Sequence, residues 1–115
     1  MTLQENTANV VNSHLAAFAE GLDALVADYD ESSVIITPRK VFRGLDQVRS
    51  FFDTFLREIP EGFWDAFKLN SRVEDRQFAL LVWEAKPWVL YATDTLYIVD
   101  SKIKVQTFAS LSSNA

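Results

Sequence analysis

The hydrophobic pattern of the chain is helical in its first half and strand-like in its second half, and this order constrains the fold more than any other feature of the sequence. Between residues 6 and 59, most apolar side chains recur at three- and four-residue steps, a spacing typical of amphipathic helices. From residue 63 to residue 111, runs of β-branched, aromatic and aliphatic residues separated by polar turns are typical of strands. Helices that precede a run of antiparallel strands predict an α+β domain, with the N-terminal helices packed on one face of a curved, mixed sheet.

The helical region contains one break and one short hairpin. Asn6–Tyr29 predicts a helix that is interrupted near Gly21, because a mid-helix glycine costs about 1 kcal/mol relative to alanine. Val34–Thr37 and Val41–Arg43 predict two short strands joined by a turn. Gly44–Ile59 predicts a further helix, which the Pro-Glu-Gly sequence that follows it would end.

The C-terminal half predicts four strands: Phe63–Glu74, Phe78–Lys86, Trp88–Val99 and Ile103–Leu111. Two segments, Phe78–Trp83 and Trp88–Val99, are apolar on both faces of the predicted sheet. One face of these strands can pack against the helices. A chain of 115 residues has no further elements to bury the apolar side chains of the other face. We therefore expect a homodimer formed through the outer face of the sheet.

Composition excludes several classes of partner and site. The net charge of -5 argues against nucleic acid and against anionic membrane surfaces, and no apolar run is long enough to span a bilayer. The absence of cysteine excludes thiol catalysis, and a single histidine argues against a metal centre. With three glycines and no phosphate-binding loop, we expect no cofactor. The N-terminus lacks the features of a signal peptide, so a cytoplasmic protein is expected.

Two polar residues in apolar surroundings are the candidate catalytic groups. Asp94 lies within Tyr-Ala-Thr-Asp-Thr-Leu-Tyr, and an aspartate in such a strand is costly unless it is paired, neutralised or used. His14 lies on the apolar stripe of the first helix and could serve as a general acid or base. The structural alternatives are a carboxylate held by tryptophan, tyrosine or threonine donors, and a core histidine with one local hydrogen bond.

The order of elements, together with the segments around His14, "FRGLDQVRSFF" and "ATDTLYIVDSKIKVQTFA", resembles the nuclear transport factor 2-like superfamily. The nearest resemblance is to its SnoaL-like and ketosteroid isomerase-like branch, and it extends over nearly all of residues 1–115, as one domain. The resemblance implies a cone-shaped, cystatin-like fold whose helices and bent sheet enclose a pocket. It also implies isomerase, cyclase or dehydratase chemistry as candidate activities.

The same resemblance assigns roles to individual positions. His14 falls where ketosteroid isomerases have an oxyanion-hole tyrosine, Asp94 where they have a protonated aspartic acid, and Phe52 where a supporting tyrosine is usual. Thr37 falls at the position of the catalytic base, and a threonine is no base at neutral pH. Together with these residues, we expect the pocket to be lined by Phe18, Tyr29, Thr37, Phe52, Phe55 and Trp83.

The function expected from the sequence is the binding of a small hydrophobic or aromatic molecule, with acid–base chemistry through His14 and Asp94 as one form of it. The alternatives are a non-catalytic dimeric ligand-binding or scaffold domain, and a protein-interaction adaptor that uses the outer face of the sheet. An open cavity that holds both His14 and Asp94 would favour chemistry. A cavity filled by phenylalanine side chains would favour the scaffold.

Overall fold

The first two helices lie end to end with a glycine between them. The computed structural model describes residues 1–112, and its first elements are α1 (Leu3–Glu20) and α2 (Leu22–Val26). Gly21 separates them at φ 111° and ψ -176°, a conformation that is essentially restricted to glycine. The break predicted near Gly21 is therefore confirmed. The first helix begins earlier than predicted, because Thr2 and Glu5 form a reciprocal capping box at its N-terminus.

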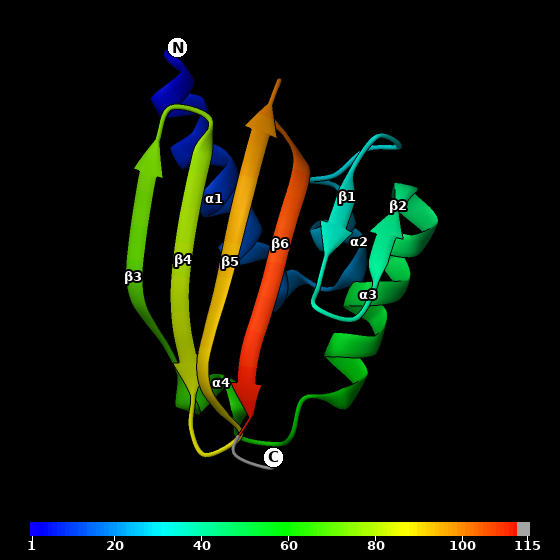
Figure 1. Ribbon diagram of the computed structural model, residues 1–115, viewed down its shortest axis with the longest axis vertical. Coiled ribbons are helices and arrows are strands. Elements are labelled where there is room, and N and C mark those ends of the chain that lie inside the picture. Colours follow the sequence, from blue (N-terminus) through cyan, green and yellow to red (C-terminus); the bar gives the residue numbers. More distant parts are fainter. Residues whose placement is uncertain (113–115) are drawn as a thin grey trace.

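The hairpin and the next helix follow the predicted order. Strands β1 (Val34–Ile36) and β2 (Val41–Arg43) pair antiparallel, and α3 (Gly44–Glu58) follows directly. In α3, Val48 and Phe52 are buried against the core, while its polar side chains face outward. The long helices α1 and α3 lie on the same side of the sheet (Figure 1).

The strand predicted after α3 begins later than expected, so the prediction for its first four residues is wrong. The expected strand Phe63–Glu74 is divided into a helical turn, α4 (Phe63–Ala66), and the strand β3 (Phe67–Asp75). Gly62 adopts a left-handed conformation, and its carbonyl accepts a hydrogen bond from the amide of Ala66. This turn buries Phe63 against Trp83 and its neighbours, a tertiary contact that outweighs the local preference of aromatic residues for strands.

The sheet is mixed and has six strands. After β3 come β4 (Phe78–Ala85), β5 (Val89–Val99) and β6 (Lys102–Ser112), and the order across the sheet is β2-β1-β6-β5-β4-β3. The four long strands, β3 to β6, pair antiparallel with one another, whereas β1 lies parallel to β6 (Figure 1). The parallel pair places β1 beside the middle of β6, and the segment between α2 and β1, which contains Tyr29, bonds the start of β6 at Ile103. The predicted α+β class with helices on one face of the sheet is confirmed.

The core lies between the helices and the inner face of the sheet. Alternate residues of β4 and β5 face inward, and the inward positions of β5 are Ala92, Asp94, Leu96 and Ile98. The side chains of the opposite face include exposed Val73, Phe78, Leu80, Tyr91 and Leu111. No helix of residues 1–112 is both long and apolar enough to cross a membrane.

Candidate functional site

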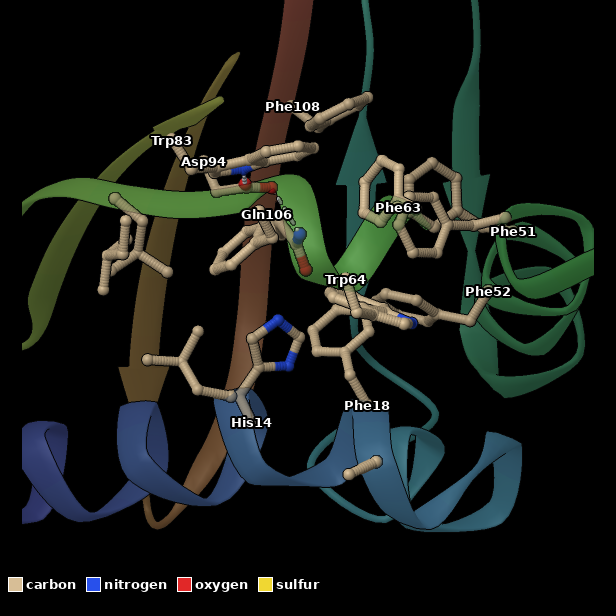
Figure 2. Close-up of a pocket in the computed structure, with 16 residues that line it drawn as sticks. His14, Phe18, Phe51, Phe52, Phe63, Trp64, Trp83, Asp94, Gln106 and Phe108 are labelled. Carbon is tan, nitrogen blue, oxygen red and sulfur yellow. Dashed lines mark hydrogen bonds between the residues drawn. The ribbon is translucent and has the colours of Figure 1, made fainter. Parts of the chain in front are cut away.

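A cavity of about 470 Å³ lies between the helices and the inner face of the long strands. Helices α1, α3 and α4 form one side, and strands β3 to β6 form the other (Figure 2). Most of its wall is aromatic or aliphatic, and the lining residues are His14, Leu15, Phe18, Ala19, Phe51, Phe52, Phe55, Phe63, Trp64, Phe67, Leu69, Leu81, Trp83, Asp94, Gln106 and Phe108. Ala19 and Trp64 are also exposed to solvent, so they lie at the rim.

The polar end of the cavity is built on three adjacent strands. Asp94 is 8% exposed, and its two carboxylate oxygens accept one hydrogen bond each. Trp83 Nε1 donates to Oδ2 at 2.7 Å, and Gln106 Nε2 donates to Oδ1 at 2.9 Å. The hydroxyl of Tyr29 donates in turn to Gln106 Oε1. A buried relay therefore runs from Tyr29 through Gln106 to Asp94, with Trp83 on the other oxygen.

The strand register explains why these groups meet. Asp94 of β5 lies opposite Leu81 on β4 and Phe108 on β6, so Trp83 and Gln106 are its inward-facing diagonal neighbours. Gln106 pairs with Leu96 across the same ladder and is almost fully buried. The site is thus held by rigid sheet pairing, while Tyr29 enters from the segment that follows α2.

Burial controls the ionisation of Asp94. Removal from water disfavours the carboxylate and raises its pKa to about 6 from an ordinary 3.8, while the hydrogen bonds from Trp83 and Gln106 act in the opposite direction. The carboxyl group is therefore mostly ionised at neutral pH. Burial also raises the pKa of Tyr29 well above its ordinary value, and the charge of Asp94 adds to the shift, so the phenol stays protonated.

His14 lies on the opposite wall of the cavity. It is 3% exposed, and its ring packs edge-on against Phe18, Tyr29 and Phe52. Burial lowers the pKa of His14 to about 4, so the imidazole is neutral near pH 7. Within residues 1–112 its Nδ1 atom has no hydrogen-bond partner. Figure 2 shows one ring nitrogen directed across the cavity toward Gln106 and Asp94.

His14 and Asp94 face one cavity but are not hydrogen-bonded to each other. Among the described residues, both oxygens of Asp94 have other donors, and Nδ1 of His14 has no partner. The arrangement is therefore not a histidine–carboxylate pair. It is two separate polar groups, one neutral and one ionised, that a molecule in the cavity can contact from opposite sides.

Six of the eight expected site residues line this cavity: His14, Phe18, Phe52, Phe55, Trp83 and Asp94. Tyr29 and Thr37 do not. Tyr29 lies behind the wall, where its hydroxyl holds Gln106, and Thr37 lies in the turn between β1 and β2, where its side chain bonds the backbone of Arg39 and Lys40. The turn needs these bonds to close, so Thr37 is a local turn residue.

Sequence reasoning missed Gln106 as a member of the site. Alternation along β6 could not have identified it, because Ile103 and Gln106 are both buried although they are three residues apart. The pairing of β6 with β5 shifts register between these two positions, and this irregularity turns Gln106 inward. Over residues 1–112, no three His, Cys, Asp or Glu side chains are grouped in a way that could hold a metal ion.

The comparisons with known proteins concern the fold. No family model matches the sequence, and no curated protein matches it. Among solved structures, it is similar to a SnoaL-like protein of unknown function from Burkholderia thailandensis, with a TM-score of 0.75, 17% identity, and coverage of 94% of this chain and 97% of the other. A nuclear transport factor 2-like protein of unknown function from Burkholderia xenovorans gives a TM-score of 0.73 at 16% identity, covering 92% and 83%.

The chain has the nuclear transport factor 2-like fold. A candidate ketosteroid isomerase from Kribbella flavida also shares this fold, with a TM-score of 0.72, 15% identity, and coverage of 96% of this chain and 82% of that one. At these identities the likeness is one of architecture, and nuclear transport factor 2-like proteins with the same architecture need not share a reaction. The chemistry of the cavity, and not the shared fold, bears on the function of this chain.

Proposed function

We propose that the protein binds a small, largely apolar aromatic molecule in the cavity between its helices and its sheet. The observation that carries this proposal is the cavity itself, with a volume of about 470 Å³ and an almost continuous aromatic wall. Among the described residues, its polar groups are those of His14, Asp94 and Gln106 and the indole N–H groups of Trp64 and Trp83. An apolar cavity of about 150 Å³ accepts one benzene ring. The larger volume therefore has room for a ligand of two to three rings, within the usual range of small-molecule sites.

The test uses native mass spectrometry of the protein after incubation with a metabolite extract. We expect a retained small molecule that dissociates on denaturation. Ala19→Trp should abolish retention, because Ala19 lines the cavity at its rim and an indole there closes the entrance. Ala16→Trp is the matched control, since Ala16 is exposed on the same helix and does not line the cavity. Equal retention by both variants would contradict the proposal.

A second candidate function is acid–base catalysis on the bound molecule. It is favoured by two polar groups on opposite walls, a neutral imidazole that can donate a hydrogen bond and a carboxylate whose pKa of about 6 is close to working pH. Asp94 would remove a proton and His14 would stabilise the oxygen on which negative charge develops. Isomerases, cyclases and dehydratases use such steps.

This second candidate is tested with tetralone in deuterated buffer. Exchange of the protons next to the carbonyl, followed by NMR, should be accelerated by the protein and should return to the buffer rate in Asp94→Asn. An unaccelerated rate for a bound tetralone would reject acid–base chemistry and leave a binding protein.

We further propose that two copies associate through the outer face of the sheet. The register places exposed Val73 beside Leu80, and Phe78 beside Tyr97, so the apolar side chains form neighbouring rows on that face. Contiguous apolar rows of this kind are unusual on a monomer surface. In a two-fold dimer the same face of each copy packs against that of the other, so the apolar rows of one copy would bury those of its partner.

A further inference from the structure

Among the described residues, Asp94 is the one ionised side chain that lines the cavity. Asp94 accepts hydrogen bonds from two neutral donors, and no lysine or arginine is among the lining residues of the described chain. The ion pairs of the molecule lie elsewhere and involve other carboxylates. A buried charge is normally paired with an opposite charge or neutralised. Asp94 is an exception, because it is ionised at neutral pH and its two hydrogen-bond donors are neutral, so its negative charge is uncompensated at one end of the cavity.

The relay behind Asp94 keeps it an acceptor. Trp83 Nε1 can only donate, and the amide of Gln106 is oriented by the hydroxyl of Tyr29, which donates to Oε1. If the amide turned over, its oxygen would face the carboxylate and the Tyr29 proton would lose its acceptor. Each carboxylate oxygen uses one of its two lone-pair sites in these bonds, so two sites remain for a molecule in the cavity.

Two aromatic residues adjoin the carboxylate: Trp83 meets it with its indole N–H edge, and Phe108 lies opposite it on β6. Phe108 is the cross-strand neighbour of Asp94, and its ring stacks on that of Trp83 with centroids 6.2 Å apart and planes inclined by 16° (Figure 2). Aromatic faces attract cations, most strongly where water is excluded. Among the described residues the same wall has no cationic side chain for an anion, because its other polar groups are a neutral imidazole, two indole N–H groups and an amide that is already bonded.

We infer that the cavity selects molecules that carry a protonated nitrogen on a planar apolar body, with the nitrogen at Asp94 and the rings against the aromatic wall. This inference rests on the proposed binding function and names its ligand class. A protonated amine donates to the free lone pairs of the carboxylate, while its planar body packs against the aromatic side chains of the cavity wall. Neutral analogues fill the same space without pairing the charge, and acids place a second negative charge beside the first.

The probes are three naphthalenes of the same shape: naphthylmethylamine, naphthylmethanol and naphthoate, substituted at the same ring position. Isothermal titration near neutral pH, in about 0.15 M salt to screen surface charge, measures each dissociation constant. We expect the amine to bind at least about tenfold more tightly than the alcohol, as a charge-assisted hydrogen bond allows, and the acid to bind most weakly.

Two variants separate the cavity charge from the net charge of the protein. Asp94→Asn should reduce the preference for the amine over the alcohol to less than about twofold, since the charge-assisted contact is gone. Asp65→Asn removes the same charge from an exposed position on α4, outside the cavity lining, and should leave the preference unchanged. A preference that survives in Asp94→Asn, or is lost in Asp65→Asn, would overturn the inference.

The pH dependence gives a second readout. As pH falls through about 6, Asp94 takes up a proton and amine binding should weaken, while alcohol binding should stay constant or improve. The other titratable groups packed around Asp94 are His14 from α1, which titrates near pH 4, and Tyr29, which titrates at alkaline pH. The inner-face pair Arg72 and Glu74 lies on β3 outside the cavity lining.

The outcomes distinguish this inference from the proposed function. If the alcohol binds as tightly as the amine, or if amine binding strengthens as pH falls below 6, the ligand-class inference is wrong and the binding function stands. If none of the three naphthalenes binds the wild-type protein, the proposal of an aromatic ligand fails and the inference fails with it.

Discussion

Replacing Asp94 with asparagine measures how much the buried, ionised carboxylate lowers the free energy of unfolding. Its pKa rises to about 6 from 3.8 because the group is removed from water. Each unit of pKa difference between the folded and unfolded states corresponds to about 1.36 kcal/mol, so the ionised carboxylate destabilises the fold by about 3 kcal/mol above pH 6. Below pH 3.8 both states are protonated and the penalty disappears. Stability is therefore lost as pH rises from 3.8 through about 6.

The asparagine has its own cost, which does not depend on pH. An amide offers one oxygen as acceptor, but Trp83 and Gln106 both donate to the native side chain. One donor would then face the amide nitrogen, which costs about 1–3 kcal/mol. At neutral pH this loss and the relief of the buried charge nearly cancel, so we expect Asp94→Asn to have the wild-type stability or to gain up to about 2 kcal/mol.

Urea unfolding of both proteins from about pH 4.5 to about pH 7.5 tests this reasoning. The free-energy difference between them should move by about 2 kcal/mol in favour of the variant over that range. His14 titrates in both proteins, so its contribution largely cancels in the difference. Asp65→Asn, at an exposed position, should show a flat difference. If the free-energy difference between Asp94→Asn and the wild type does not change with pH, the conclusion that Asp94 is a buried, ionised carboxylate is refuted. A loss above about 3 kcal/mol at pH 7.5 would make Asp94 a structural anchor.

Three further perturbations test other parts of the structure. Phe52→Ala should cost about 3–5 kcal/mol in urea unfolding, because the ring is 2% exposed and packs against three other aromatic rings and His14; a loss below about 1 kcal/mol would mean that the site is not core. Leu80→Glu should convert a dimer into a monomer in sedimentation, whereas Val41→Glu, on the exposed hairpin strand β2, should not; a wild-type monomer at micromolar concentration would reject the interface. Gly21→Ala should lower stability by about 1–3 kcal/mol although its methyl group meets no atom within 4 Å, because the backbone conformation alone opposes it; unchanged thermal unfolding would contradict this.

Local features of the sequence were enough to predict most elements of the fold. The spacing of apolar residues within one or two turns predicted α1 and α3, and the position of Gly21 predicted the break between α1 and α2. Period-two alternation and polar turns predicted β4, β5 and β6 within a few residues at their ends. These features depend on side chains that are neighbours along the chain, so they can be recognised without tertiary information.

The surroundings of Asp94 show where local reasoning ends. Its apolar neighbours along β5 predicted that it would be costly to leave unpaired, but they could not name its partners. The bond from Gln106 comes from twelve residues away, and the bond from Tyr29 to Gln106 joins residues 77 positions apart. Only the antiparallel register of β5 with β6, and the parallel pairing of β1 with β6, bring these groups together.

Local patterns in the sequence predicted most of the elements and their order, and they identified one aspartate and one histidine in apolar surroundings. Two features depend on contacts between distant parts of the chain: Tyr29 supports the site from behind its wall, and Phe63 begins a helical turn in place of a strand. Each of these outcomes depends on which distant residues fill the space around a side chain. A polar group in the core is stabilised by whichever donor or acceptor the sheet register places beside it, and that register is a property of the whole fold.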